Sequence, residues 1–142
     1  MSKVTVKLQD VVDHMEMADD VDTNHFLNRE TGEFIYCNQD FMDADEYEEA
    51  LDEVESGDCV ALPTKFDIHE YKIMERFVYH EVVDEQKSNK LANAITGRGA
   101  FRRFKNTAHE LGLIQDWYDY RDQAYRKIAR EWCENFGIKY EE

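Results

Sequence analysis

The sequence predicts an α+β fold in which a small antiparallel sheet of about three strands packs with a mainly helical C-terminal part of four helices. Two β-prone runs flank a short glycine-containing loop between residues 24 and 38, which is typical of a hairpin. A third apolar run, residues 59–62, ends at the only proline, Pro63, whose ring cannot donate to a sheet ladder. Beyond Pro63 apolar residues recur at helical spacing almost to the C-terminus.

Size and composition predict one folded domain over residues 1–142. The chain has 142 residues, of which 42% are hydrophobic and 13% aromatic, and a disordered chain has far less apolar content. No apolar run approaches the roughly 20 residues that cross a bilayer, and the first residues lack the pattern of a secretory signal. The three cysteines never form a Cys-x-x-Cys pair, which indicates neither a disulfide framework nor a zinc knuckle. We therefore expect a cytoplasmic protein that does not bind membranes.

Charge is distributed unevenly along the chain. The formal net charge is -15; residues 1–86 carry 6 Lys and Arg against 24 Asp and Glu, a balance of -18, and residues 87–142 carry 11 against 8, a balance of +3. A field this negative repels nucleic acid at long range, so a nucleic-acid site is disfavoured and must be local to the second part. We expect the acidic N-terminal part to contact a protein partner. Alternatively the two parts neutralise each other, within one chain or between the chains of a homodimer.

The acidic N-terminal part contains two helical patterns around the hairpin. Apolar residues recur at helical spacing over residues 7–17, before the acidic run 19–22. A second stripe persists among many carboxylates in residues 45–55 and is ended by Gly57. The favoured interpretation of this second segment is a solvated acidic helix. The alternatives are a docking face for a basic partner and a surface that mimics nucleic acid.

Four helices are predicted after Pro63. Asp67 is a candidate N-cap for the first, whose apolar residues continue to Val82. The other three cover about residues 86–96, 100–111 and 114–136. Gly112 and Gly137 each precede an apolar residue, a pattern typical of a left-handed helix stop after which the apolar side chain packs back.

The last helix is the most aromatic segment. Its stripe consists of Trp117, Ala124, Ile128 and Trp132. We interpret this stripe as core rather than as a platform for stacked bases. Arg121 is expected to stack on a ring or to pair with a carboxylate inside the fold.

Residues 96–105 are the strongest candidate for a binding site. Two glycines precede a helix whose first turns carry dense positive charge, and free N–H groups at a helix start together with arginines bind anions. Phosphate, a nucleotide or an RNA backbone fits this chemistry. The candidate residues are Gly97, Arg98, Gly99, Arg102, Arg103 and Lys105. The pattern is neither a P-loop nor a complete dinucleotide fingerprint, and the favoured interpretation is a connector between helices whose cations neutralise the acidic part.

No catalytic, cofactor-binding or metal-binding residue is predicted. The acidic run at residues 43–46 lacks the glycine and the final glutamate of an EF-hand loop. On a continuous helix His69 and His80 would lie about 16 Å apart, too far to share one ion. Asp10 and His14 form an isolated pair without a nucleophile or an orienting group.

Several segments of the chain follow the sequence pattern of a known family. They include residues 94–105 and the aromatic, arginine and alanine positions of the last helix. The hairpin residues 26–33, residues 60–63 and the helix that contains Tyr71 follow the same pattern. On these segments, which span roughly residues 20–138, the chain resembles the bacterial uncharacterised protein family UPF0158. The resemblance implies a one-domain bacterial cytosolic protein and transfers no activity, substrate or catalytic residue.

The leading functional hypothesis is a small acidic interaction or regulatory module without catalytic machinery. Its two candidate contact faces are the acidic N-terminal part and the basic surface of residues 98–105. The alternative is an anion-binding protein for RNA or a nucleotide that uses the helix start at residues 97–105. An enzyme comes third, because that function requires a titratable group with a perturbed pKa in a deep pocket, which a sequence does not reveal.

Overall fold

A computed structural model describes residues 4–17, 23–40 and 42–142. Internal contacts divide the chain into two compact units, residues 1–68 with 125–142 (unit 1) and residues 69–124 (unit 2). Unit 1 contains the described strands, and the described part of unit 2 is helical. The predicted α+β class is confirmed, and a single domain over residues 1–142 stays a prediction. Among the described helices none is both long enough and apolar enough to cross a membrane.

The predicted hairpin and third strand form one antiparallel sheet in unit 1. The strands are β2 (Thr23–Asn28), β3 (Phe34–Asn38) and β4 (Cys59–Ala61), in the order β3-β2-β4. The register sets Phe26 of β2 opposite Ile35 of β3. At the hairpin turn Gly32 has a φ of 78°, and its N–H donates to the Asn28 carbonyl oxygen over 2.8 Å. Glycine adopts this left-handed conformation without a Cβ clash, so the turn needs it.

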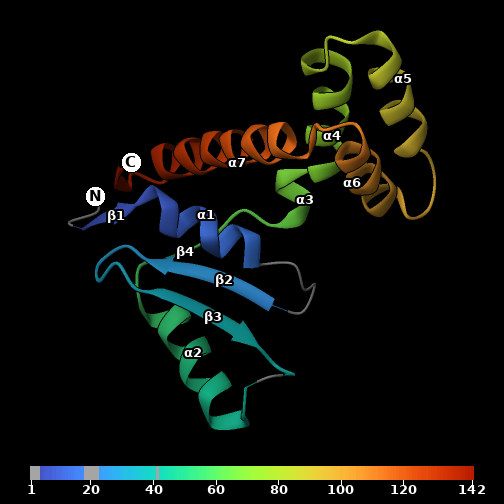
Figure 1. The fold of residues 1–142 in the computed structure, drawn as a ribbon. Helices are drawn as coiled ribbons and strands as arrows, with labels where there is room; N and C mark the ends of the chain where they lie inside the picture. The colour runs from blue at the N-terminus through green and yellow to red at the C-terminus, as the bar shows by residue number, and fades with distance from the viewer. Residues whose placement is uncertain (1–3, 18–22, 41) are drawn as a thin grey trace. The chain divides into compact units, whose positions relative to one another are not determined.

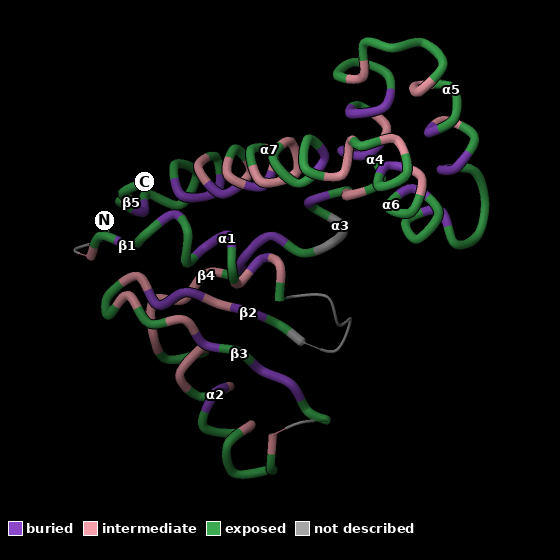
Figure 2. The backbone as a smooth tube through the Cα atoms, viewed as in Figure 1, coloured by how far each residue is buried: buried purple, intermediate pink, exposed green. Residues whose placement is uncertain are grey.

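Helices cover both faces of this sheet (Figure 1). One face carries α1 (Leu8–Met17) and the other carries α2 (Ala44–Ser56). Side chains alternate along β3, so Ile35 and Cys37 point to α2, where they pack with Ala50. The partly buried residues that complete this cluster are Phe26, Met42, Tyr47, Leu51, Val54 and Cys59. The stripe of α1 is buried as predicted (Figure 2), and the acidic residues 19–22 lie outside the described residues.

A second, two-stranded sheet joins the two ends of the chain within unit 1. Strand β1 (Thr5–Lys7) pairs in parallel with β5 (Lys139–Glu141). Sequence analysis predicted neither strand, because a three-residue strand shows no detectable alternation and its partner lies at the far end of the chain. The turn before β5 was predicted: Gly137 has a φ of 65°, and the Ile138 N–H donates to the Cys133 carbonyl oxygen over 2.8 Å.

The predicted continuous helix from Asp67 to Val82 is wrong. The chain forms three pieces, α3 (Lys65–Ile68), α4 (Glu70–Arg76) and the π-helix η1 (Phe77–Glu81). His69 separates α3 from α4 with a φ of 54°, and no residue pattern signals the break because non-glycine residues rarely adopt positive φ. Asp67 is not the N-cap either. Its carboxylate accepts the Thr64 N–H (2.9 Å) while Thr64 Oγ1 accepts the Asp67 N–H (3.3 Å), so Thr64 is the cap of a capping box.

The helices of unit 2 surround an aromatic core. They are α4 with η1, α5 (Glu85–Ala94), α6 (Ala100–Glu110) and the first part of α7 (Ile114–Asn135). The rings of Phe77, Phe104 and Trp117 meet edge to face, with centroids 4.9 to 6.1 Å apart. Each such pair contributes about 0.5–1.5 kcal/mol beyond its area burial. Arg121 Nε donates to the Glu70 carboxylate, which confirms the predicted pairing with a carboxylate.

A histidine pair lies between α1 and the sheet of unit 1. The Nδ1 atoms of His14 and His25 are 3.4 Å apart, and the His14 ring stacks on Phe34 with centroids 4.1 Å apart. His25 is only 8% exposed, and no described residue bonds its Nε2 atom. Burial lowers the pKa of both imidazoles; Asp10 and Asp13 oppose the lowering at His14, and His14 adds to it at His25. The folded state therefore favours the neutral pair.

This pair makes unit 1 sensitive to acid. Because both pKa values are lowered in the folded state, the unfolded chain takes up protons at higher pH than the folded chain. The pair's contribution to the free energy of unfolding is thus complete above about pH 6.5 and is lost as the pH falls below that value. Urea unfolding at pH 5.5 and 7.5 should give the lower stability at pH 5.5. Replacing both residues (His14→Phe with His25→Phe) should remove most of this difference, whereas the exposed His80→Gln should preserve it; an unchanged difference in the double variant contradicts the assignment.

Candidate functional site

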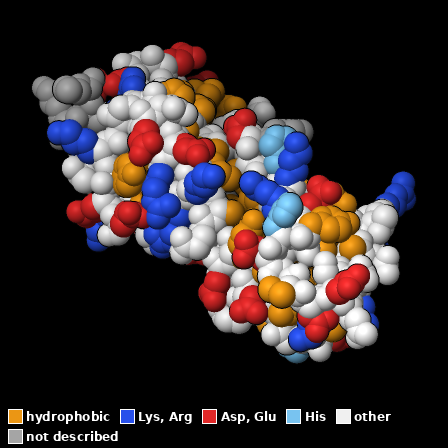
Figure 3. Space-filling model, turned by 90° about the horizontal axis from the view of Figure 1, so that it is seen from above, with side chains coloured by type: hydrophobic (Ala, Val, Ile, Leu, Met, Phe, Trp, Pro, Cys, Tyr) orange, Lys and Arg blue, Asp and Glu red, His pale blue; other side chains and the backbone are white. Residues whose placement is uncertain are grey.

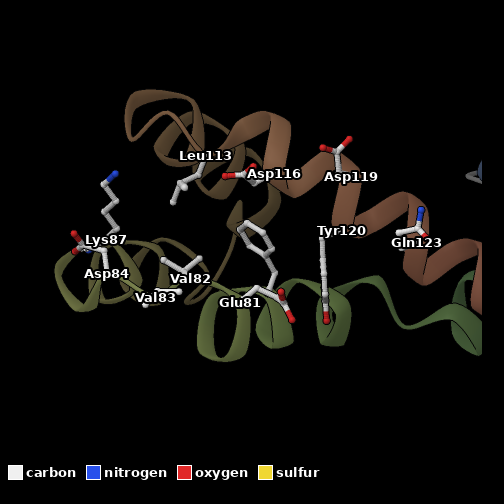
Figure 4. A pocket seen from close by; sticks show the side chains of 11 residues that line it. Glu81, Val82, Val83, Asp84, Lys87, Leu113, Asp116, Asp119, Tyr120 and Gln123 are labelled. Carbon is white, nitrogen blue, oxygen red and sulfur yellow. Dashed lines mark hydrogen bonds between the residues drawn. The ribbon is translucent and has the colours of Figure 1, made fainter.

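A cleft of about 560 Å³ opens on unit 2 (Figure 4). The start of α7 forms one wall, and η1, the connector that follows it and the start of α5 form the other. The lining residues are Phe77, Glu81, Val82, Val83, Asp84, Lys87, Leu113, Asp116, Asp119, Tyr120 and Gln123. All of them belong to unit 2, so the unit carries the cleft by itself.

The floor of the cleft is apolar. Phe77 reaches it from the aromatic core and lies against Tyr120, with ring centroids 5.5 Å apart. Leu113 borders the floor at the start of the α7 wall. It is positioned by Gly112, which has a φ of 74°, and by its own N–H, which donates to the Ala108 carbonyl oxygen over 2.8 Å. This is the helix stop predicted from the sequence, and it sets one edge of the cleft.

The connector between η1 and α5 places a valine in solvent. The Val82 N–H donates to the Phe77 carbonyl oxygen, five residues back, and closes the π-turn over 3.2 Å. Two residues later Asp84 caps α5 by accepting the Lys87 N–H over 3.1 Å. The short link between these two bonds leaves Val83 97% exposed. Val83 therefore adds exposed apolar surface to that of the cleft.

The rim of the cleft is acidic. Glu81 and Asp84 come from one wall and Asp116 and Asp119 from the other, and all four are exposed. Lys87 is the one cation among the lining residues. On the surface of the molecule acidic side chains lie beside exposed hydrophobic ones (Figure 3). Carboxylates on both walls of an apolar hollow favour a ligand that combines positive charge with apolar surface.

The lining offers carboxylates, one amine, one amide and one phenol as polar side-chain groups. No lining residue is Ser, Thr, Cys or His, and carboxylates that perform acid–base chemistry occupy drier, more apolar surroundings than this exposed rim. Burial raises the pKa of all three cysteine thiols, that of Cys133 to about 11, which leaves little reactive thiolate. Within the described ranges no group of three or more His, Cys, Asp or Glu is placed to hold a metal ion.

The segment predicted to bind anions is the connector between α5 and α6. Arg103 folds back onto it: Nε donates to the Ala94 carbonyl oxygen over 3.1 Å, and the two terminal nitrogens donate to the carbonyl oxygens of Thr96 and Arg98. The guanidinium thus holds the end of α5 and the loop together. Arg103 shapes the loop, and backbone oxygens occupy its donors.

The other predicted residues divide into two groups. Gly97 and Gly99 have φ of 78° and 73° and allow the chain to turn into α6. Arg98 in the connector and Arg102 and Lys105 in the first turns of α6 are exposed. Anion binding by this segment stays a prediction.

The acidic helix predicted from the sequence is α2. Asp43 caps it by accepting the Glu46 N–H over 2.9 Å, and its apolar side is used against the sheet. Asp45, Glu48 and Glu49 are exposed. Docking of a partner on α2 stays a prediction.

Sequence reasoning did not identify the cleft. Its residues come from segments 77–87 and 113–123, whose proximity results from tertiary packing. The one local signal was the pair Val82 and Val83, placed between acidic residues directly before a helix cap.

The chain is similar to known sequences along almost its whole length. The sequence profile described as "Uncharacterised protein family (UPF0158)" matches residues 1–141. The "UPF0158 protein PA5073" of Pseudomonas aeruginosa is 28% identical over 132 residues, which cover 90% of this chain and 84% of that protein. No solved structure matches the chain at a significant level.

The two neighbouring arginines of the α5–α6 connector should differ in their effect on stability. Arg103→Met removes donors from three backbone carbonyl groups and should lower the free energy of unfolding by about 1–2 kcal/mol. Arg102→Met changes an exposed side chain and should alter it by less than about 0.5 kcal/mol. Urea unfolding followed by circular dichroism measures both. Equal effects of the two variants would contradict the structural role of Arg103.

Proposed function

We propose that this chain, which belongs to the uncharacterised protein family UPF0158, is a non-enzymatic interaction module that binds a cationic segment of a protein partner in the cleft of unit 2. The observation that supports this function is the apolar floor bordered by four exposed carboxylates and a single lysine. We also propose that the protein functions in the bacterial cytoplasm. The bacterial relative supports this location, and so do the three unpaired cysteines, because thiols stay reduced in the cytosol.

The chemistry of the cleft specifies the partner's residues. An aliphatic or aromatic side chain would bury its surface against Val82, Leu113 and Tyr120, at roughly 25 cal/mol for each Å² removed from water. Lysine or arginine on either side of it would meet the carboxylates of the two walls. Apolar burial would provide affinity, and the charges would provide orientation and a faster encounter.

The cleft fits this role better than the acidic helix α2. Both surfaces attract cations, but the apolar residues of α2 pack against Ile35 and Cys37 of the sheet. The cleft keeps apolar surface accessible beside its charge, including Val83. A partner therefore finds an exposed apolar residue, Val83, beside the cleft, whereas the large apolar residues of α2 are at most partly exposed.

Matched charge variants test the proposal. The probe is a fluorescein-labelled synthetic peptide with a tryptophan and two leucines flanked by lysines, titrated into the full chain and followed by fluorescence anisotropy. Neutralising the rim (Glu81→Gln, Asp116→Asn, Asp119→Asn) should weaken binding by about ten-fold or more. Val83→Ser should weaken it without lowering the melting temperature, because the side chain is 97% exposed.

The control changes the net charge equally on the other acidic surface. Neutralising α2 at Asp45→Asn, Glu48→Gln and Glu49→Gln should alter the dissociation constant by less than about two-fold, because these carboxylates do not line the cleft and exposed charges that make no direct contact are screened by salt. Equal losses of affinity in the two triple variants would show that the peptide responds only to net charge, and would overturn the proposal. A larger loss of affinity in the α2 variant would overturn the proposal and identify α2 as the surface that binds the partner.

A further inference from the structure

Unit 2 presents, away from its cleft, a surface of the opposite character. Between Glu85 and Glu110 the chain contains no Asp or Glu, although it has 32 of them in total, and this stretch holds five Lys and Arg besides Lys87 of the cleft. In its middle Phe101 is 42% exposed at the start of α6. The exposed cations around it in sequence are Arg98, Arg102 and Lys105. An exposed aromatic ring flanked by cations is the chemistry that the acidic cleft requires.

Phe101 is presented by a rigid part of the fold. Arg103 holds the preceding loop through three backbone carbonyl oxygens. Tyr71 meets the Phe101 ring edge to face, with centroids 6.3 Å apart, and its hydroxyl donates to the Ile95 carbonyl oxygen over 2.9 Å. A side chain held in this way loses little conformational freedom on binding, so more of the contact energy remains as affinity.

The cleft and the Phe101 surface of one chain do not meet each other. Phe101 lies in the first turn of α6, and Leu113 of the cleft follows the end of the same helix. An eleven-residue helix separates its ends by about 16 Å, at 1.5 Å for each residue. Phe101 can therefore enter only the cleft of another molecule.

We infer that the cationic segment bound by the cleft is the α6 start of a second copy of this chain, with Phe101 on the apolar floor and Arg102 and Lys105 facing the carboxylate rim. This inference rests on the proposed function, whose partner it names. The contact is heterologous, because a cleft on one copy meets a different surface on the next. A wild-type dimer retains one free cleft on one copy and one free Phe101 surface on the other, so association continues past the dimer or closes into a ring.

Complementation between two variants tests the inference on the full chain. The cleft variant carries Asp116→Lys and Asp119→Lys, and the donor variant carries Arg102→Ser and Lys105→Ser, all at exposed positions. In sedimentation velocity at about 0.15 M salt, where long-range repulsion between acidic copies is screened, the wild type should associate as its concentration rises. Each variant alone should associate at least about ten-fold more weakly. An equimolar mixture should recover a dimer and nothing larger, since it contains one intact cleft paired with one intact donor.

Three outcomes would overturn the inference. The wild type stays monomeric throughout the concentration series, the single variants associate as the wild type does, or their mixture stays monomeric. A monomeric wild type that still binds the lysine-flanked peptide would refute only the identity of the partner, whereas loss of both results would also refute the proposed function. The wild type is also tested for retardation of a single-stranded RNA oligonucleotide in a native gel. If the wild type is monomeric and retards the RNA, and the donor variant does not, the Phe101 surface binds nucleic acid instead.

Discussion

The edge-to-face packing of Phe77, Phe104 and Trp117 is the interaction on which unit 2 depends. These rings come from η1, α6 and α7, so one cluster sets the spacing of the elements that carry both proposed contact surfaces. Phe77 belongs to the core and also to the floor of the cleft. The π-turn that begins at Phe77 then releases the chain in an extended conformation, and Val83 projects into solvent as a result. The shape of the cleft is thus a consequence of core packing.

Charge has a different role at each place in the molecule. The Asp43 carboxylate caps a helix and Glu70 pairs with Arg121, so part of the acidic content supports the fold. The rim of the cleft instead sets charge beside accessible apolar surface. Arg103 shows the same division among the cations, because its donors are used by the loop while its neighbours face solvent. Net charge alone therefore does not identify a contact surface in this protein.

Local chemistry was sufficient to predict several elements. The hairpin followed from two β-prone runs around Gly32, and the helix stops at Gly112 and Gly137 followed from a glycine placed before an apolar residue. The failures have physical causes as well. His69 adopts a positive φ that no residue type announces, and β1 pairs with a strand at the other end of the chain. Within the predicted anion site the sequence could not separate Arg103 from Arg102, because only the fold brings three carbonyl oxygens to one guanidinium.

By itself the sequence determined the fold class, the position of the sheet, the family resemblance and the opposite charge of the two parts of the chain. Periodicity, turn residues and composition act over a few neighbouring positions, and these properties are local. Tertiary structure decided where charge meets exposed apolar surface, because the walls of the cleft come from segments 77–87 and 113–123. It also decided which cations remain available, since hydrogen bonds made by the folded backbone occupy Arg103 and leave Arg98, Arg102 and Lys105 in solvent.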